Sequence, residues 1–381
     1  MKHYLIKHLL VSTFLFCLLS LTSCKKYLDK SPLSDISDTE AYKNFTNFQG
    51  FTEELYNSIP LITTQDYHNN WNFGEDEMWE IGETRLFAYS VDQGNYWGWN
   101  TDYYSWFKAG GDPSSQNRGD KGHLWGLSWY AIRKANIGIA NLDKLTDATT
   151  EEKNLIAGQL YFFRGWFHFM LMQYWGGLPY VDMVIPSDQP IQLPRLSYQE
   201  TADKAAADFQ KAADLLPVDW DQTVVGKQTL GNNNFRINKI MALAFLGKDL
   251  LWAGSPLMNR SSTGNSNYSV DYCKKAADAF AAALKITEST GRYKLADFSN
   301  YSQIFYTYNQ SGKLPGLQES IFMENLLGAL NQWRWNQVND YRPMTIDGSG
   351  IKVNPTANYV DYYGMANGLP ITDPASGFDP T

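Results

Sequence analysis

The apolar positions of the chain are most regular between residues 154 and 181, where they predict one long helix. They recur at steps of three and four residues, which places them on one helical face. Tyr161 and Trp166 belong to a second apolar face on the opposite side. A helix that is hydrophobic nearly all round packs between neighbouring elements. We therefore predict a central core helix that ends at Gly176, because glycine allows a left-handed closing residue.

A membrane span is the alternative interpretation of this stretch. Arg164 and His168 interrupt the apolar run, and a charge at bilayer depth costs roughly 3 kcal/mol on insertion scales. The interruption favours a buried helix of a folded domain. Because buried charge requires partners, we expect Arg164 and His168 to be core groups with satisfied hydrogen bonds and not a catalytic pair.

Helical spacing and capping residues predict five further helices. Ser197 and Glu200 have the spacing of a capping box, and either Thr149 or Thr150 can cap the central helix. Prolines mark several ends, because proline cannot continue the helical hydrogen bonds. The five predicted helices span residues 38–60, 123–142, 197–217, 234–253 and 269–291.

The last two of these helices carry their own signals. Gly254 and Pro256 are predicted to stop the helix that begins at residue 234. Ser269 is predicted to cap the final helix. That helix is expected to turn Leu284 inward, together with Cys273, which we interpret as a buried small hydrophobe and not a reactive thiol.

Short polar links between helices predict antiparallel hairpins, the clearest being the link TDATT before the central helix. Small residues at the predicted contacts resemble tetratricopeptide packing, although no clean period of about 34 residues appears. The predicted fold is therefore all-α: an irregular tetratricopeptide-like solenoid of helical hairpins with long aromatic-rich loops.

Two aromatic segments interrupt the helical pattern. Residues 71–107 hold five of the 13 tryptophans among glycines and asparagines, and residues 333–335 form a second segment. Flat aromatic rings stack on the apolar C–H face of a sugar while polar neighbours bind its hydroxyls. Burial in the core is the alternative, but these tryptophans alternate with polar or glycine neighbours. The candidate glycan-binding residues are Trp97, Trp99, Asn100, Trp333, Arg334 and Trp335.

The first 23 residues have the build of a secretory signal, with Lys2 and Lys7, an apolar run and then small residues. Cys24 follows at the position where bacterial lipoproteins accept diacylglycerol. An ordinary signal peptide with a chance cysteine is the alternative. Cysteine is otherwise nearly absent, which favours lipidation, and acyl chains add roughly 0.8 kcal/mol of burial per methylene. We predict an exported lipoprotein anchored through Cys24.

Composition narrows the class of protein further. Of the 381 residues, 44% are hydrophobic, which is enough for a large core. The net charge is −8, and loss of Lys2 and Lys7 with the leader leaves about −10. Nucleic acid is therefore not an expected partner.

The sequence shows no recognisable catalytic or metal site. His68, His123 and His168 lack the four-residue spacing of a helical metal site, and no nucleotide-binding or nucleophile-elbow motif occurs. Carboxylates near Trp79, between residues 75 and 83, are the one candidate for a glycosidase pair. Solvated loop carboxylates are the preferred interpretation, because the sequence shows no burial that would separate their pKa values. We predict no enzymatic activity, no metal and no cofactor.

Six segments, in order, resemble the SusD/RagB family of surface glycan-binding lipoproteins of Bacteroidetes. They are CKKYLDKSP, LWGLSWYAIRKANIGIANLDKL, AGQLYFFRGWFHFMLMQYWGGLPYV, PRLSYQETADKAAADFQKAADLLP, ESIFMENL and NPTANYVDYYGMANGLP. The resemblance covers residues 24–381. It implies a protein that binds oligosaccharides through loops in both halves. It also implies a SusC-like TonB-dependent transporter as partner and a place in the outer membrane, lipid-anchored and facing the exterior.

The chain departs from the family pattern in places. Gly165 replaces the usual alanine after Arg164, and Lys25 and Lys26 stand where some relatives have an acidic export signal. The family's R-D-P-R section is absent, so we expect a chain truncated at its end. The expected parts are a signal peptide (1–23), an N-terminal SusD-like part (24–225) and a C-terminal SusD/RagB part (226–381).

Two functions of other classes remain open at this stage. An exported glycoside hydrolase would show turnover that depends on a carboxylate pair. A tetratricopeptide-type scaffold that binds only protein would show no affinity for sugar and would tolerate loss of the loop tryptophans.

Overall fold

The computed structural model describes residues 38–60, 78–80, 94, 124–186, 188, 190, 192–301, 319–322 and 353–380. The chain divides into two compact units, residues 1–41 and 42–381. Of the first unit only residues 38–41 are described, as the start of a helix. The elements below belong to the second unit unless stated.

The predicted helix over residues 38–60 is in fact two helices, α3 (Asp38–Lys43) and α4 (Phe45–Asn57). Asn44 separates them with an extended backbone (φ −127°, ψ 163°). Its side-chain oxygen accepts a hydrogen bond from the Asn47 N–H at 2.9 Å. Asparagine competes with a continuous helix by bonding to nearby backbone, and here it caps the helix that follows.

The central helix α9 (Thr150–Trp175) confirms the prediction of a buried core helix. Thr149 is its N-cap: the Thr149 hydroxyl accepts from the Glu152 N–H, and the Glu152 carboxylate accepts from the Thr149 N–H. Gly176 closes the helix with a φ of 74°, which glycine adopts without strain. Both faces are buried, and Trp166 is only 1% exposed.

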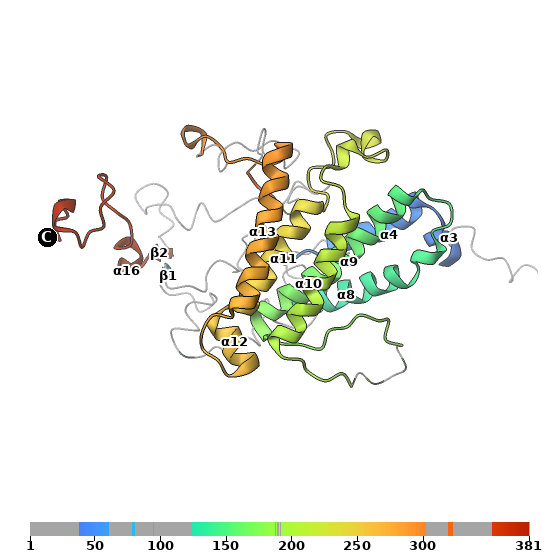
Figure 1. The fold of residues 1–381 in the computed structure, drawn as a ribbon, viewed down its shortest axis with the longest axis horizontal. Coiled ribbons are helices and arrows are strands. Elements are labelled where there is room, and N and C mark those ends of the chain that lie inside the picture. Colours follow the sequence, from blue (N-terminus) through green and yellow to red (C-terminus); the bar gives the residue numbers. More distant parts are fainter. Residues whose placement is uncertain are drawn as a thin grey trace, which may run out of the picture. The chain divides into compact units, whose positions relative to one another are not determined.

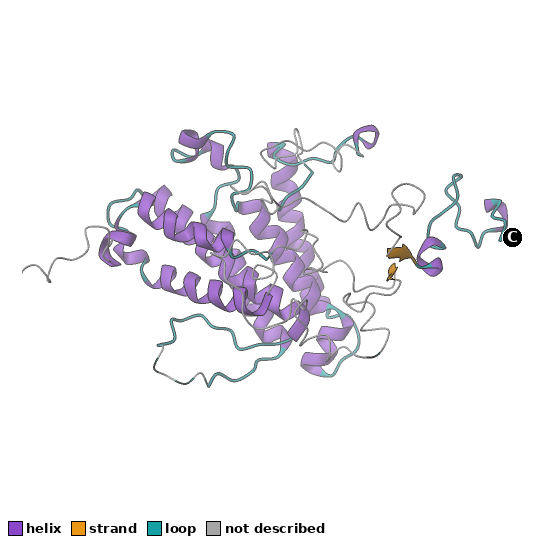
Figure 2. Cartoon of the chain, turned by 180° about the vertical axis from the view of Figure 1, so that it is seen from behind, coloured by secondary structure: helices purple, strands orange, loops and turns teal. Residues whose placement is uncertain are grey.

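Four helices join α9 in a stack of neighbours: α8 (Leu124–Ala140), α10 (Tyr198–Leu215), α11 (Lys239–Gly254) and α13 (Val270–Thr290). α9 lies between α8 and α10, α10 also contacts α11, and α11 contacts α13 (Figure 1). Figure 2 shows that helices dominate the described part of the chain. This arrangement confirms the predicted all-α fold of helical hairpins.

The pairing of α8 with α9 is antiparallel, as predicted. Trp129 of α8 meets His168 of α9, with ring centroids 5.9 Å apart. Asn136, further along α8, instead meets Arg164, which comes earlier in α9, through a hydrogen bond of 3.0 Å. The order reverses from one helix to the other, so their directions are opposed.

α10 begins and ends as predicted. The hydroxyl of Ser197 accepts from the Glu200 N–H, and the Glu200 carboxylate accepts from the Ser197 N–H, which completes the capping box. Leu216 follows the last helical turn and packs on Gly158 of α9. A Cβ on residue 158 would lie 2.6 Å from the Leu216 Cγ, so alanine there would require Leu216 to shift.

The start of α11 and the segment after it differ from prediction. α11 begins later than residue 234, because Asn238 is its N-cap and accepts from the Met241 N–H at 3.0 Å. α11 ends at Gly254, as predicted, but Pro256 also opens a further helix that was not predicted, α12 (Pro256–Thr263). Proline suits the first turn, where its missing N–H would have no helical partner.

α13 is partly as predicted. Gly291 closes it in the left-handed conformation (φ 63°), but the Ser269 side chain forms no capping hydrogen bond. Leu284, predicted to face inward, is 60% exposed, and Cys273 is half-buried, not fully buried. Among the described elements α13 packs mainly on α11, so only one of its sides is covered.

Aromatic side chains form the centre of the stack. Phe162 of α9 meets Phe209 of α10 and Phe245 of α11, with both centroid distances 5.7 Å. Phe322, from a later segment, lies 5.3 Å from Phe245 at an angle of 86°. Edge-to-face contacts of this kind stabilise a core beyond area burial.

The other described elements are short. β1 (Met78–Glu80) pairs antiparallel with β2 (Val353–Pro355). The remaining short helices are η1 (Leu142–Lys144), η2 (Trp220–Gln222), η3 (Gly226–Thr229), η4 (Phe298–Asn300), α16 (Ala357–Val360) and η6 (Pro374–Ser376).

No single described helix has both the length and the apolar composition of a membrane span, although α11 and α12, bent by 64°, meet that test as a pair.

Candidate functional site

Arg164 of α9 and Asp208 of α10 form a buried, two-pronged ion pair. Arg164 Nε donates to Asp208 Oδ2 at 2.6 Å, and Arg164 Nη2 donates to Asp208 Oδ1 at 2.7 Å. The side chains are 9% and 7% exposed. Burial alone would lower the pKa of Arg164, but the hydrogen bonds and charge of Asp208 raise it. The planar fork of arginine matches a carboxylate, so the pair fixes the orientation of the two helices.

Three more groups complete this buried network. Arg164 Nη1 donates to Asn136 Oδ1 at 3.0 Å and to the Asp182 carbonyl at 3.2 Å. The Tyr180 hydroxyl donates to Asp208 Oδ2 at 2.5 Å. Burial, and then the charge of Asp208, raise the pKa of Tyr180 well above its ordinary value, so the hydroxyl keeps its proton.

His168 is the neighbouring buried polar residue. The Val181 N–H donates to His168 Nε2 at 3.1 Å, so the proton of the neutral ring is on Nδ1, which lies 2.8 Å from the Arg164 carbonyl oxygen. The ring stacks on Tyr180, with centroids 3.9 Å apart. Burial lowers the pKa of His168 to about 3. Arg164 and His168 therefore both have satisfied hydrogen bonds, which confirms the prediction for them.

The chain that follows α9 is held against α8 by polar contacts to its backbone. Asn136 Nδ2 donates to the carbonyls of Val181, at 2.9 Å, and Met183, at 3.1 Å. Arg133 Nη1 donates to the Ile185 carbonyl at 2.6 Å. An apolar pocket of about 750 Å³ lies between this segment and α8. Trp125 and Trp129 line it and meet edge to face, 5.5 Å between centroids, opposite aliphatic residues of the segment.

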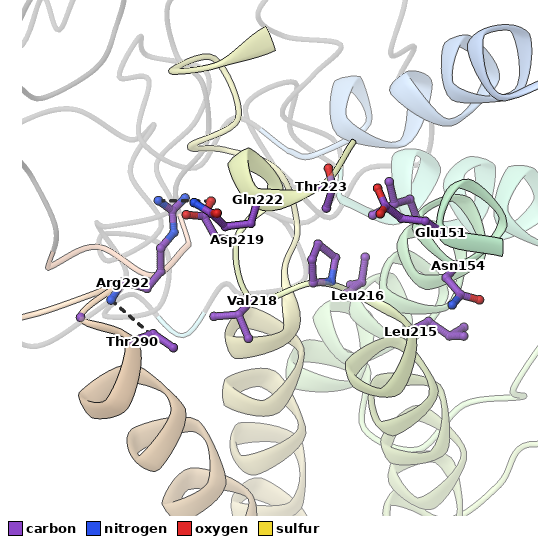
Figure 3. A pocket seen from close by; sticks show the side chains of 13 residues that line it. Glu151, Asn154, Leu215, Leu216, Val218, Asp219, Gln222, Thr223, Thr290 and Arg292 are labelled. Carbon is purple, nitrogen blue, oxygen red and sulfur yellow. Dashed lines mark hydrogen bonds and ion pairs between the residues drawn. The ribbon is translucent and has the colours of Figure 1, made fainter. Parts of the chain in front are cut away.

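A second cavity, the helix-end cleft, has a volume of about 890 Å³ (Figure 3). It lies where the N-terminus of α9 and the C-termini of α10 and α13 come together, beside η2. Both volumes fall in the range of roughly 300–1,000 Å³ that is usual for ligand pockets. The residues that line the cleft are Glu151, Asn154, Leu155, Leu215, Leu216, Pro217, Val218, Asp219, Gln222, Thr223, Thr290, Gly291 and Arg292.

The polar groups of the helix-end cleft lie on two sides of an aliphatic floor. Figure 3 shows Glu151 and Asn154 on one side, Asp219 and Arg292 on the other, and Leu216 between them. Arg292 Nη1 lies 3.7 Å from Asp219 Oδ1. The cleft therefore offers hydrogen-bonding groups and apolar C–H surface together, but no aromatic platform.

The residues predicted from the sequence to bind glycan or lipid lie outside the part of the chain that the structure describes. They are Cys24, Trp97, Trp99, Asn100, Trp333, Arg334 and Trp335. Among the carboxylates between residues 75 and 83, Glu80 lies in β1. The other carboxylates of this stretch also lie outside the part of the chain that the structure describes. The described residues contain no group of three or more histidine, cysteine, aspartate or glutamate side chains that could hold a metal ion.

Sequence reasoning missed the partner of Arg164 and the residues of both cavities. Asp208 is one of several acids on α10, and nothing local marks it as the partner of Arg164. Trp125 and Trp129 fall within the helix predicted over residues 123–142, but no sequence signal marks them as pocket residues; each is half-buried and lines the apolar pocket. Asp219 and Arg292 follow helix ends, a position that carries no sequence signal for a cleft.

Comparison with known proteins identifies the family. A model of the SusD-like family, described as starch-binding and associating with the outer membrane, matches residues 26–248. No curated protein matches the chain.

Solved structures share the fold. A SusD-like carbohydrate-binding protein from Bacteroides fragilis superposes with a TM-score of 0.55 at 19% identity, over 87% of this chain and 56% of that one. A SusD superfamily protein from Bacteroides vulgatus gives a TM-score of 0.53 at 17% identity, over 84% and 62%. A SusD homolog from Bacteroides thetaiotaomicron gives 0.51 at 19%, over 76% and 48%.

The chain spans less than two thirds of the length of these three relatives, and at this level of identity they establish the fold alone. The family match establishes more than the fold, because it covers more than half of the chain and runs from just after Cys24 into α11. The chain belongs to the SusD-like family.

Proposed function

We propose that this protein is a non-catalytic, lipid-anchored surface protein that binds oligosaccharides and passes them to a TonB-dependent, SusC-like transporter of the outer membrane. The observation that carries the proposal is the match of residues 26–248 to a family described as starch-binding and associating with the outer membrane. The hairpin stack supports it, because the same fold occurs in a SusD-like carbohydrate-binding protein.

The proposal gives the parts of the chain separate tasks. Cys24 carries the lipid anchor, and the aromatic loops around Trp97, Trp99, Asn100 and residues 333–335 hold the sugar by stacking and hydrogen bonding. The helical stack presents a rigid face to the transporter. Its rigidity follows from the buried ion pair between Arg164 and Asp208, which ties α9 to α10.

One experiment separates this proposal from an exported glycoside hydrolase and from a protein-binding scaffold. The protein without its leader is titrated calorimetrically with neutral hexasaccharides of glucose, mannose, galactose and xylose, and each mixture is then analysed by chromatography. We expect binding of at least one sugar and no shortened products. Turnover would indicate a hydrolase. A complete absence of binding would contradict the proposal and favour the scaffold.

A further inference from the structure

The helix-end cleft contains polar groups that the rest of the described structure leaves without partners. Asn154 and Gln222 form no side-chain hydrogen bond within the described residues. An amide group both donates and accepts hydrogen bonds, as a sugar hydroxyl does. These groups suit a ligand that carries several neutral hydroxyls.

The charged groups of the cleft are already engaged. Glu151 Oε1 accepts from the Val224 N–H at 2.7 Å. Asp219 Oδ1 accepts from the Asp221 N–H at 3.0 Å and faces the guanidinium of Arg292. Two carboxylates against one guanidinium leave the cleft with a net negative charge, which disfavours an anionic ligand. A neutral ligand meets no such penalty.

The floor of the cleft offers aliphatic surface to the C–H groups of a sugar ring. Leu215, Leu216, Pro217 and Val218 line it. Figure 3 shows Leu216 between the two polar sides. The frame is fixed, because η2 is anchored by the Trp220 indole N–H, which donates to a backbone carbonyl at 2.8 Å. A site formed before binding avoids part of the entropy that ordering it would cost.

We propose that the helix-end cleft is a second carbohydrate subsite, which binds a neutral oligosaccharide independently of the aromatic loops. Asn154 and Gln222 bind hydroxyls, and the aliphatic floor contacts the ring. The inference rests on the proposed function, namely that the protein binds carbohydrate, and adds a place and a preference for uncharged sugars.

The test compares an Asn154→Ala/Gln222→Ala variant with the wild type. Calorimetric titration uses the neutral hexasaccharides of glucose, mannose, galactose and xylose, and hydrogen–deuterium exchange follows residues 150–156 and 216–223 at saturating sugar. Wild type should show protection of both segments. The variant should bind the cleft ligand at least tenfold more weakly and lose this protection, with an unchanged melting temperature.

Matched controls are available on α9 and on η3, the helix that follows η2. Lys153→Ala and Gln228→Ala remove exposed side chains that do not line the cleft, and both should keep wild-type binding and protection. If the double variant melts lower, Gln222→Ala alone serves as the test, because this side chain is exposed and forms no hydrogen bond to any residue that the structure describes.

The outcomes separate the two proposals. If the wild type binds a hexasaccharide and the variant matches it in affinity and protection, the subsite is wrong and the proposed function stands. If the wild type binds none of the four sugars, both are wrong. Tighter binding of a hexauronate than of a neutral hexasaccharide at the protected segments would contradict the inferred ligand class.

Discussion

Arg164 and Asp208, 44 residues apart in the chain, meet in the core through two parallel hydrogen bonds of 2.6 and 2.7 Å. The same guanidinium reaches Asn136 of α8 and the backbone carbonyl of Asp182. One side chain therefore joins three helices and the segment that follows α9. Removing one partner of a buried pair leaves a charge in the core with no compensation.

The first prediction concerns this pair. Asp208→Asn removes the negative charge but keeps the size of the side chain, so the buried guanidinium of Arg164 loses its counter-ion. We expect a loss of about 3–5 kcal/mol in the free energy of unfolding, measured by urea denaturation. Asp278→Asn is the matched control, because Asp278 forms an exposed ion pair with Lys274, and it should change the free energy of unfolding very little. Equal effects of the two substitutions would contradict the role assigned to Asp208.

The second prediction concerns acid sensitivity. Burial lowers the pKa of His168 from its ordinary 6.5 to about 3, so between these values the unfolded chain binds a proton that the folded chain does not. Stability should therefore fall as the pH drops below 6.5, by at most about 1.4 kcal/mol per pH unit from this group. His168→Asn should flatten the profile between pH 6.5 and 5, measured by urea denaturation. If the free energy of unfolding falls with pH equally steeply in the variant and the wild type, His168 is not the source of the acid sensitivity.

How much of the fold is predictable depends on the range of the interaction that decides it. The run from Leu155 to Trp175 is long and periodic, and the capping box at Ser197 uses residues three apart, so these elements were predicted correctly. For the central helix the sequence left Thr149 and Thr150 open as caps, and the structure selects Thr149. The helix break at Asn44 and the new helix that begins at Pro256 were missed, because each residue is compatible with two local roles. Only the packing of neighbouring segments decides which role is adopted.

The candidate sites are less predictable for the same reason. The helix-end cleft is assembled from Glu151, in the first turn of α9, and from Asp219 and Arg292, which follow the ends of α10 and α13, and these residues share no sequence pattern. The aromatic loops did carry a local signal, since tryptophans alternate there with glycine and polar residues, and the residues predicted from it remain a proposal. A spacing rule finds sites built from one segment and misses those built from several.

The third prediction concerns Asp249 of α11, which is fully buried and has no hydrogen-bond partner on either carboxylate oxygen within the described part of the chain. Burial, and then the nearby charge of Asp203, raise its pKa well above the ordinary 3.8. Between the two values the folded chain holds a proton that the unfolded chain has lost, so this group lowers stability as the pH rises. The loss begins near pH 4 and continues up to the folded pKa.

Asp249→Asn should remove this loss. The variant should be more stable than the wild type at pH 7, and the difference should shrink toward pH 4, where the wild-type carboxyl is neutral in both states. Thermal melts across this range measure it, with Asp278→Asn as the exposed control. If the difference in stability between variant and wild type stays constant with pH, the pKa of Asp249 is the same in the folded and unfolded chain, and the prediction is wrong.

The central claim is that the aromatic loops hold a sugar, and the most direct measurement is the dissociation constant of an oligosaccharide for loop variants. Trp97→Ala or Trp99→Ala, and separately Trp333→Ala or Trp335→Ala, should weaken binding about tenfold per anchor, equivalent to about 1.4 kcal/mol. The melting temperature should stay the same, because truncating a buried tryptophan would instead cost about 3–5 kcal/mol of stability. Unchanged affinity with a lowered melting temperature would contradict the account and assign these tryptophans to the core.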